Sequence, residues 1–146
     1  RDRGERMPLS ILRTQGKAIS RERIFDRRIV AEVLSMMEGV THKDGTAPGA
    51  AIDGYRVAGK TGTARIVGPA GYNDERHVAW FAGVVPVSHP RLVMVVVVNE
   101  PKAGLSGGGA VAAPVFARVA QRSLRLLGVP PDGQLVQGKS LAETRG

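Results

Sequence analysis

The sequence predicts an α+β fold in which an antiparallel sheet is flanked by helices. Three segments have the alternation and apolar content of strands: 56–65, 77–85 and 91–99. The connections between them are too short for a crossover helix, so the strands must be antiparallel neighbours. Helical patterns precede and follow the strands. A chain of 146 residues, 42% of them hydrophobic, can bury one ordinary core.

The first helix is expected to begin after Asp26 and to end at Gly39. Its apolar residues recur at spacings of three and four, on one helical face: Ile29, Val30, Val33, Leu34, Met37 and Val40. Asp26 can cap the first turn, and Gly39 suits the last. Upstream, Met7–Leu12 is expected to form a short edge strand, with Pro8 near its start where a missing amide hydrogen is tolerated.

The strand Arg56–Arg65 is the candidate binding edge. Its side chains alternate, so that Lys60 and Gly62 face one way and Thr61 and Thr63 face the other. Gly62 has no side chain and lets another backbone or a ligand approach closely. One cation, two hydroxyls and a bare backbone suit an anionic or carbonyl-bearing ligand laid alongside the strand. The alternative is an exposed strand whose charged edge blocks aggregation.

The next two strands follow loops rich in glycine and proline. Residues 66–76 are expected to form a long hairpin connection to the strand His77–Val85. The third strand, Arg91–Asn99, is a near-continuous apolar run, which implies burial on both faces.

The final helix is expected over Ala110–Leu127, ended by Gly128 and the prolines that follow. Pro114 is acceptable only if it lies in the first turn, because it lacks an amide hydrogen. Residues 132–146 show no periodicity and are expected to form a mobile tail.

Composition excludes several classes of function. The net charge of +8 attracts anionic partners, but 4% aromatics and no recognised binding motif favour a solvated basic face over a nucleic-acid surface. The absence of cysteine excludes thiolate zinc sites, iron–sulfur clusters and disulfides, and no metal or cofactor is expected. Leu92–Val98, the longest apolar run, is far short of the roughly twenty residues of a membrane span. His42, His77 and His89 are expected to be surface or edge residues.

Four motifs follow one another in a specific order: Lys60–Ala64, Trp80–Gly83, Val95–Pro101 and Gly108–Phe116. This succession resembles the C-terminal half of the transpeptidase domain of a class B penicillin-binding protein, of the division-specific type. The resemblance implies a penicillin-binding-protein/serine β-lactamase-like fold, with residues 1–131 as the C-terminal portion of that domain. It departs from the family at Ser106 and Gly107, where relatives carry an aromatic pair that forms a wall of the pocket.

The resemblance implies a peptidoglycan D,D-transpeptidase that cross-links stem peptides at the septum through a serine acyl-enzyme and is a target of β-lactams. Enzymes of this kind combine Ser-x-x-Lys, a Ser-x-Asn type motif and Lys-Thr-Gly. None of the seven serines has Lys three positions on or Asn two positions on. The nucleophile is therefore absent from this chain, which alone should be inactive. The resemblance places the serine on the remaining N-terminal part of the same protein.

The resemblance also assigns roles to single residues. Lys60 would hold positive potential beside the serine, keep its companion lysine neutral and attract the terminal carboxylate of the D-Ala-D-Ala substrate. The hydroxyls of Thr61 and Thr63 would bind that carboxylate, and the amide of Thr63 would be one oxyanion-hole donor. Gly62 would admit the substrate backbone, and Arg65 would shape the mouth of the pocket.

The same resemblance implies a periplasmic domain of a protein anchored in the inner membrane, with membrane proteins of the division machinery as partners and no nucleic acid. Two alternatives remain open. One is a D,D-carboxypeptidase or β-lactamase-like hydrolase, in which water accepts the acyl group. The other is a non-catalytic penicillin-binding sensor or scaffold domain.

Overall fold

The computed structural model describes residues 4–6, 8, 20–68, 71–102 and 107–133. A short antiparallel pair, β1 (Glu5–Arg6) and β2 (Glu22–Arg23), precedes α1 (Arg27–Glu38). Two 3-10 turns, η1 (Gly39–Thr41) and η2 (Pro48–Ala50), lead to the sheet. The sheet consists of β3 (Ala58–Gly68), β4 (Gly71–Val85) and β5 (Leu92–Asn99), and α2 (Gly108–Leu126) ends the described fold.

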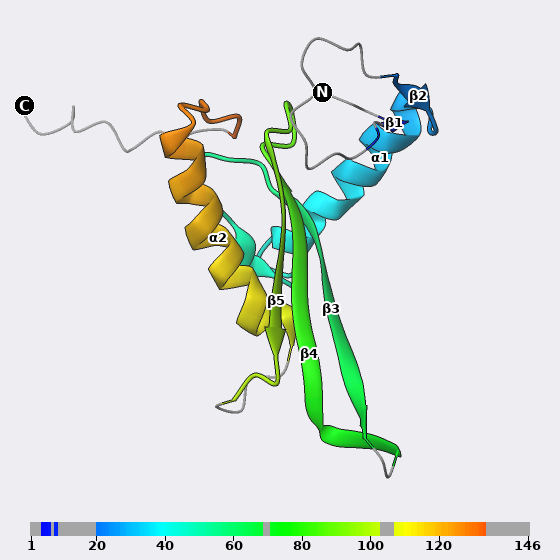
Figure 1. The fold of residues 1–146 in the computed structure, drawn as a ribbon. Helices are drawn as coiled ribbons and strands as arrows, with labels where there is room; N and C mark the ends of the chain where they lie inside the picture. The colour runs from blue at the N-terminus through cyan, green and yellow to red at the C-terminus, as the bar shows by residue number, and fades with distance from the viewer. Residues whose placement is uncertain (1–3, 7, 9–19, 69–70, 103–106, 134–146) are drawn as a thin grey trace, which may run out of the picture.

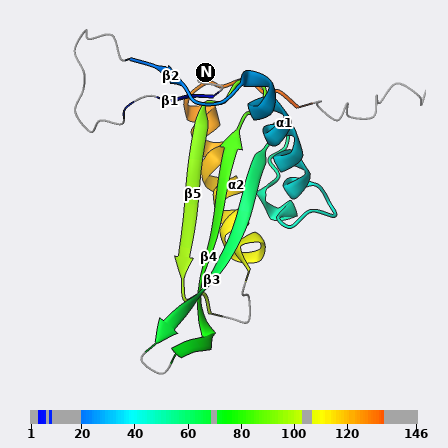
Figure 2. The same cartoon turned by 90° about the vertical axis from the view of Figure 1, so that its right-hand side faces the viewer.

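The three long strands form one antiparallel sheet in the order β3-β4-β5. Figures 1 and 2 show the strands side by side, with α2 lying along one face of the sheet. The predicted fold class and the antiparallel order are confirmed. Among the described strands, β3 and β5 are the edges, so β3 has one side without a strand partner.

The core lies between α2 and the facing side chains of the sheet. Phe81 of β4 and Phe116 of α2 are fully buried and meet edge to face, with ring centroids 4.9 Å apart. Small residues of the helix let it approach the strands closely: Ala112, Ala113 and Ala120 are all 0% exposed. Leu92, Met94, Val96 and Val98 of β5 pack against this cluster.

The opposite face of the sheet is open in the described part of the chain. Val93, Val95 and Val97 alternate with the core-facing residues of β5 and are 75%, 58% and 61% exposed. The prediction that both faces of this strand are buried is therefore wrong for the described residues. The pleat sends alternate valines to a face that no described element covers at β5.

The predicted boundaries of α1 are confirmed by its caps. The Asp26 carboxylate accepts a hydrogen bond from the Arg28 amide at 2.7 Å, and Gly39 caps the other end. No residue of α1 is buried, and Ile29 and Val33 on its predicted apolar face are 54% and 42% exposed. The helix is amphipathic, but its apolar side is only partly covered.

The hairpin between β3 and β4 differs from the prediction. β3 runs on to Gly68 and β4 begins at Gly71, and beyond a register shift between Arg65 and Val67 the pairs are Val67 with Tyr72 and Gly68 with Gly71. The hairpin therefore projects beyond the end of β5 (Figure 1). Antiparallel pairing uses backbone groups, so glycine-rich and polar composition did not prevent strand formation there.

Two further predictions are corrected at the C-terminal end. Pro114 lies inside α2 rather than in its first turn, because the helix already begins at Gly108. It cannot donate to the carbonyl of Ala110, which costs one helical hydrogen bond. The first residues of the predicted tail are held in place, since the Gly133 amide donates to the Gly54 carbonyl at 3.0 Å. The rest of the tail, and most of the predicted strand Met7–Leu12, lie outside the described residues.

Candidate functional site

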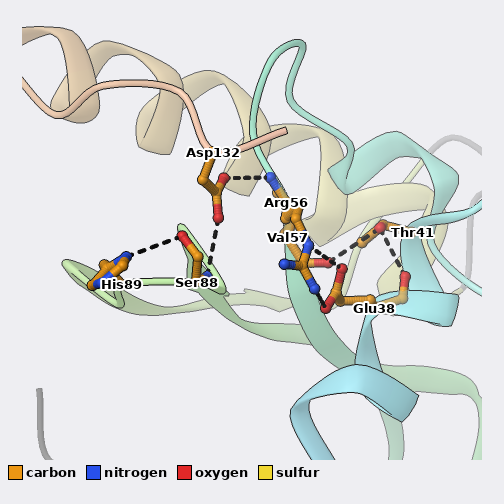
Figure 3. Close-up of polar contacts among 7 residues, drawn as sticks. All are labelled: Glu38, Thr41, Arg56, Val57, Ser88, His89 and Asp132. Atoms are coloured by element: carbon orange, nitrogen blue, oxygen red, sulfur yellow. Dashed lines mark hydrogen bonds and ion pairs between the residues drawn. The ribbon is translucent and has the colours of Figure 1, made fainter. Parts of the chain in front are cut away.

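The segment that leads into β3 is held from three directions (Figure 3). The Arg56 guanidinium donates two hydrogen bonds to the Glu38 carboxylate at the end of α1, at 2.9 and 2.6 Å. The Thr41 hydroxyl donates to the carbonyls of Glu38 and Val57. The hydrogen bonds to Glu38 raise the pKa of Arg56, and burial opposes them. The position of β3 is therefore tied to the end of α1.

Asp132 supplies the third attachment. One of its carboxylate oxygens accepts from the Arg56 amide at 2.8 Å, and the other accepts from the Ser88 amide at 3.0 Å. His89 Nδ1 lies 3.4 Å from Ser88 Oγ, so an Asp, a Ser and a His come together here (Figure 3). They do not form a catalytic triad, because the carboxylate binds backbone amides and leaves the imidazole unoriented. His89 is exposed, as predicted.

Arg56→Met should lower the free energy of unfolding by about 1–2 kcal/mol, because it leaves the Glu38 carboxylate, only 15% exposed, without its partner. Arg76→Met is the matched control, since Arg76 pairs with Glu100 in an ion pair exposed on both sides, and its loss should be much smaller. Urea unfolding of the complete domain measures both. Equal losses would contradict a special role for the Arg56 pair.

Lys60 lies on the open face of the sheet. The β3–β4–β5 register places Lys60 beside Ala82 and Val95, so it shares a face with the exposed valines. The side chain is exposed, and Nζ donates to the Thr61 carbonyl at 2.9 Å. Nothing else in the described residues engages the ammonium group. It is available to a ligand or to another part of the protein.

Gly62 is required for a reason that the sequence did not reveal. Trp80 is its direct partner on β4, and a Cβ at Gly62 would lie 1.9 Å from Cε2 of the indole. The ring therefore occupies the space above the glycine, on the same face as Lys60. Trp80 is a site residue that sequence reasoning missed. The sequence feature that could have indicated it is that Trp80 is the only tryptophan and is the first residue of the Trp80–Gly83 motif.

Thr61 and Thr63 lie on the other face of β3, as the alternation predicted. The Thr61 hydroxyl donates to the Thr46 hydroxyl at 3.5 Å, a long contact. The Thr63 hydroxyl accepts from the amide of Gly108, the first residue of α2, at 3.4 Å. Thr63 thus sits at the N-terminus of a helix of 19 residues, whose dipole adds positive potential there.

The N-terminus of α2 packs directly on the backbones of β3 and β4. A Cβ at Gly108 would lie 2.1 Å from the Trp80 carbonyl oxygen and 2.7 Å from that of Gly62. Neither oxygen can move without displacing its strand. Gly108 therefore sets the distance between the helix and the Lys60–Thr63 segment.

Gly108→Ala should destabilise the domain by about 1–3 kcal/mol through overpacking, since it pushes α2 away from Thr63. Gly107→Ser is the control, because a Cβ at Gly107 meets no atom within 4 Å and serine is a good N-cap. Thermal unfolding of both variants tests this. An alanine tolerated equally well at both positions would show that the contact does not matter.

Arg65 lies opposite His77, beside the irregularity in the hairpin. His77, which was expected to be a surface or edge residue, is half-buried, and its Nε2 is enclosed, without a hydrogen-bond partner among the described residues. At the predicted aromatic wall, Gly107 forms the N-cap of α2, and Ser106 lies outside the described residues.

The arrangement presents a cation, hydroxyls and a strand edge, which suits a peptide bearing a carboxylate. Within the described ranges, no group of three His, Asp or Glu side chains is placed to bind a metal. Over the same ranges, neither helix has the length and hydropathy needed to cross a membrane.

Comparison with known proteins decides the family. Residues 2–121 match the family described as "Penicillin binding protein transpeptidase domain". The chain belongs to this family. The transpeptidase fragment is 46% identical over 125 residues to the Escherichia coli K12 peptidoglycan D,D-transpeptidase FtsI, covering 86% of this chain and 21% of the relative.

Solved structures agree with the family assignment. The transpeptidase fragment matches the transpeptidase domain of penicillin-binding protein 3 from Burkholderia pseudomallei with a TM-score of 0.78 and 41% identity. The match covers 88% of this chain and 39% of that one. It also matches penicillin-binding protein 3 from Mycobacterium tuberculosis in complex with ampicillin, with a TM-score of 0.69 and 29% identity over 81% of this chain and 28% of that one. The chain thus spans about a fifth of the length of the curated relative.

Proposed function

We propose that this chain supplies the Lys-Thr-Gly half of the active site of a peptidoglycan D,D-transpeptidase that works at the division septum and is inhibited by β-lactams. The observation that carries the proposal is the placement of Lys60–Thr63 on the free edge strand of the sheet, against the N-terminus of α2. The name of the Escherichia coli relative gives the reaction class.

The roles proposed for the site residues follow from their positions. A stem peptide ending in D-Ala-D-Ala would lie along the free edge of β3 as an added strand. Lys60 would attract its carboxylate, and the hydroxyls of Thr61 and Thr63 would bind it. The Thr63 amide would donate to the oxyanion, and Arg65 would border the site.

The reaction requires a serine from outside this chain. The serine oxygen would attack the carbonyl carbon of the D-Ala-D-Ala bond, and the terminal D-alanine would leave with the proton taken from the serine. An amine of a neighbouring stem peptide would then take the acyl group and release the serine. Lys60 would act electrostatically in both steps.

The open face of the sheet supports the proposal that the serine lies on another part of the same protein. Val93, Val95 and Val97 form an exposed apolar strip on the face that carries Lys60. Such a strip is typical of a surface covered by another part of a protein. We propose that the nucleophile-bearing part of the same protein covers it and brings the serine to Lys60. The solved relative has more than half of its transpeptidase domain outside the match, enough to do so.

The proposal extends to the setting of the complete protein. Septal cross-linking requires a periplasmic domain, an anchor in the inner membrane outside this chain and contacts with membrane proteins of the division machinery. The sequence similarity to a relative named FtsI supports this setting.

Labelled penicillin offered to the complete protein tests the chemistry. We expect covalent labelling of one serine outside this chain, and a protein that is not acylated would rule out the enzyme. Products from lipid-linked precursors then separate the alternatives. Cross-linked stem peptides support the transpeptidase, whereas release of D-alanine without cross-links would indicate the hydrolase. Labelling without any product would indicate the sensor or scaffold.

A further inference from the structure

The outer side of α2 carries a stripe that the core and the candidate site do not use. Its members recur at helical spacing: Val115, Arg118, Val119, Arg122 and Leu126. The first four line a surface hollow of about 240 Å³. Val119 is 46% exposed, and Leu126 is 89% exposed. In Figure 1 no other described helix or strand lies over the side of α2 that faces away from the sheet.

The arginines of this stripe differ from most other exposed arginines of the fold. Arg6, Arg56 and Arg76 each form an ion pair with a carboxylate. In the part of the chain that the structure describes, no carboxylate pairs with Arg118 or Arg122. Like charges four residues apart on a helix are mildly destabilising. These two arginines therefore raise the free energy of the helix, with no compensating contact in the described structure.

The apolar residues of the stripe do not contribute to the interface between α2 and the sheet. Phe116 and Leu124 of α2 are fully buried against it and already fill that interface. Val119 and Leu126 point away from the core. A membrane-binding helix buries a wide apolar face in lipid, but the wide apolar face of α2 is already buried in the core.

The arginines of the stripe indicate which ligand it suits. Arginine, with its planar pair of donors, suits bidentate recognition of carboxylates.

We propose that this stripe is a docking surface for an acidic amphipathic helix of a partner protein. Two carboxylates spaced one helical turn apart would meet Arg118 and Arg122, and an aliphatic side chain between them would fill the hollow over Val119. Charge complementarity argues for this partner, because the stripe presents two unpaired cations around an apolar floor. The proposal does not depend on the chemistry at Lys60.

The test uses the complete protein and a synthetic helical peptide with glutamates four residues apart beside a leucine stripe. We expect the peptide to bind at least ten times more tightly than its glutamine version. Arg118→Glu/Arg122→Glu should weaken this binding at least tenfold. Arg28→Glu/Lys43→Glu makes the same change in net charge at exposed positions elsewhere and should leave binding within twofold. Labelling by penicillin should be unchanged in both double variants.

Four outcomes would overturn the proposal. The first is that the peptide does not bind the wild-type protein. The second is an equal loss of peptide binding in both double variants, which would indicate an effect of net charge alone. A lower melting temperature for Arg118→Glu/Arg122→Glu than for the control would show that another part of the same protein covers the stripe. Tighter binding to phosphatidylglycerol vesicles than to the peptide, lost in the same variant, would indicate a lipid surface.

Discussion

Lys60→Ala in the complete protein should slow acylation by labelled penicillin at least about a hundredfold, the scale on which removal of one preorganised electrostatic contact acts in acyl-transfer enzymes. Lys60 is the cation of the Lys-Thr-Gly motif and lies on the open face of the sheet, and among the described residues its Nζ donates only to the Thr61 carbonyl. Its removal takes away the positive potential that would hold the substrate carboxylate. Acylation rates at several penicillin concentrations separate weaker binding from slower reaction.

Stability should hardly change in this variant. The Lys60 side chain is exposed, and substitutions at such positions usually alter the free energy of unfolding by less than about 0.5 kcal/mol. Lys43→Ala, at another exposed lysine, is the matched control and should be acylated at the wild-type rate. If Lys60→Ala is acylated as fast as the wild type, the role proposed for Lys60 is wrong.

Phe116→Ala should lower the free energy of unfolding of the complete transpeptidase domain by about 3–5 kcal/mol. The ring is fully buried, meets Phe81 edge to face, and fills the space beside Gly83, where a Cβ would come within 2.6 Å of it. Its loss leaves a cavity between α2 and β4. Urea unfolding measures the change, and acylation should fall only as far as the folded fraction falls.

Leu126→Ala is the control on the same helix. Leu126 is 89% exposed, so the same truncation of a large apolar side chain should cost less than about 0.5 kcal/mol. Comparable losses in the two variants would mean that α2 does not present Phe116 to the sheet.

Local signals in the sequence identified the elements well. Asp26 and Gly39 mark α1 because capping depends on hydrogen bonds between near neighbours in the chain. The short connections made the antiparallel order of the strands unavoidable. The succession of motifs around Lys60–Thr63 led to the family that the comparisons show.

The sequence-based predictions were incomplete or wrong where residues far apart in the chain come into contact. The sequence could not show that Trp80 lies over Gly62, or that Gly108 sets the α2 N-terminus on the strand backbone. It also suggested a long loop where β3 and β4 continue to pair, and a surface histidine where His77 Nε2 is enclosed. The valines of β5 predicted burial on two faces, and the described structure buries one.

By itself the sequence determined where the main helices and strands lie and which side of β3 each candidate site residue faces. These properties depend on side-chain periodicity and on residues close together in the chain. Only the tertiary structure decided how α2, Trp80 and Asp132 contact β3 and the segment that leads into it, and which apolar faces remain uncovered in the described part of the chain. Those contacts join residues far apart in the chain, and their geometry is set by packing.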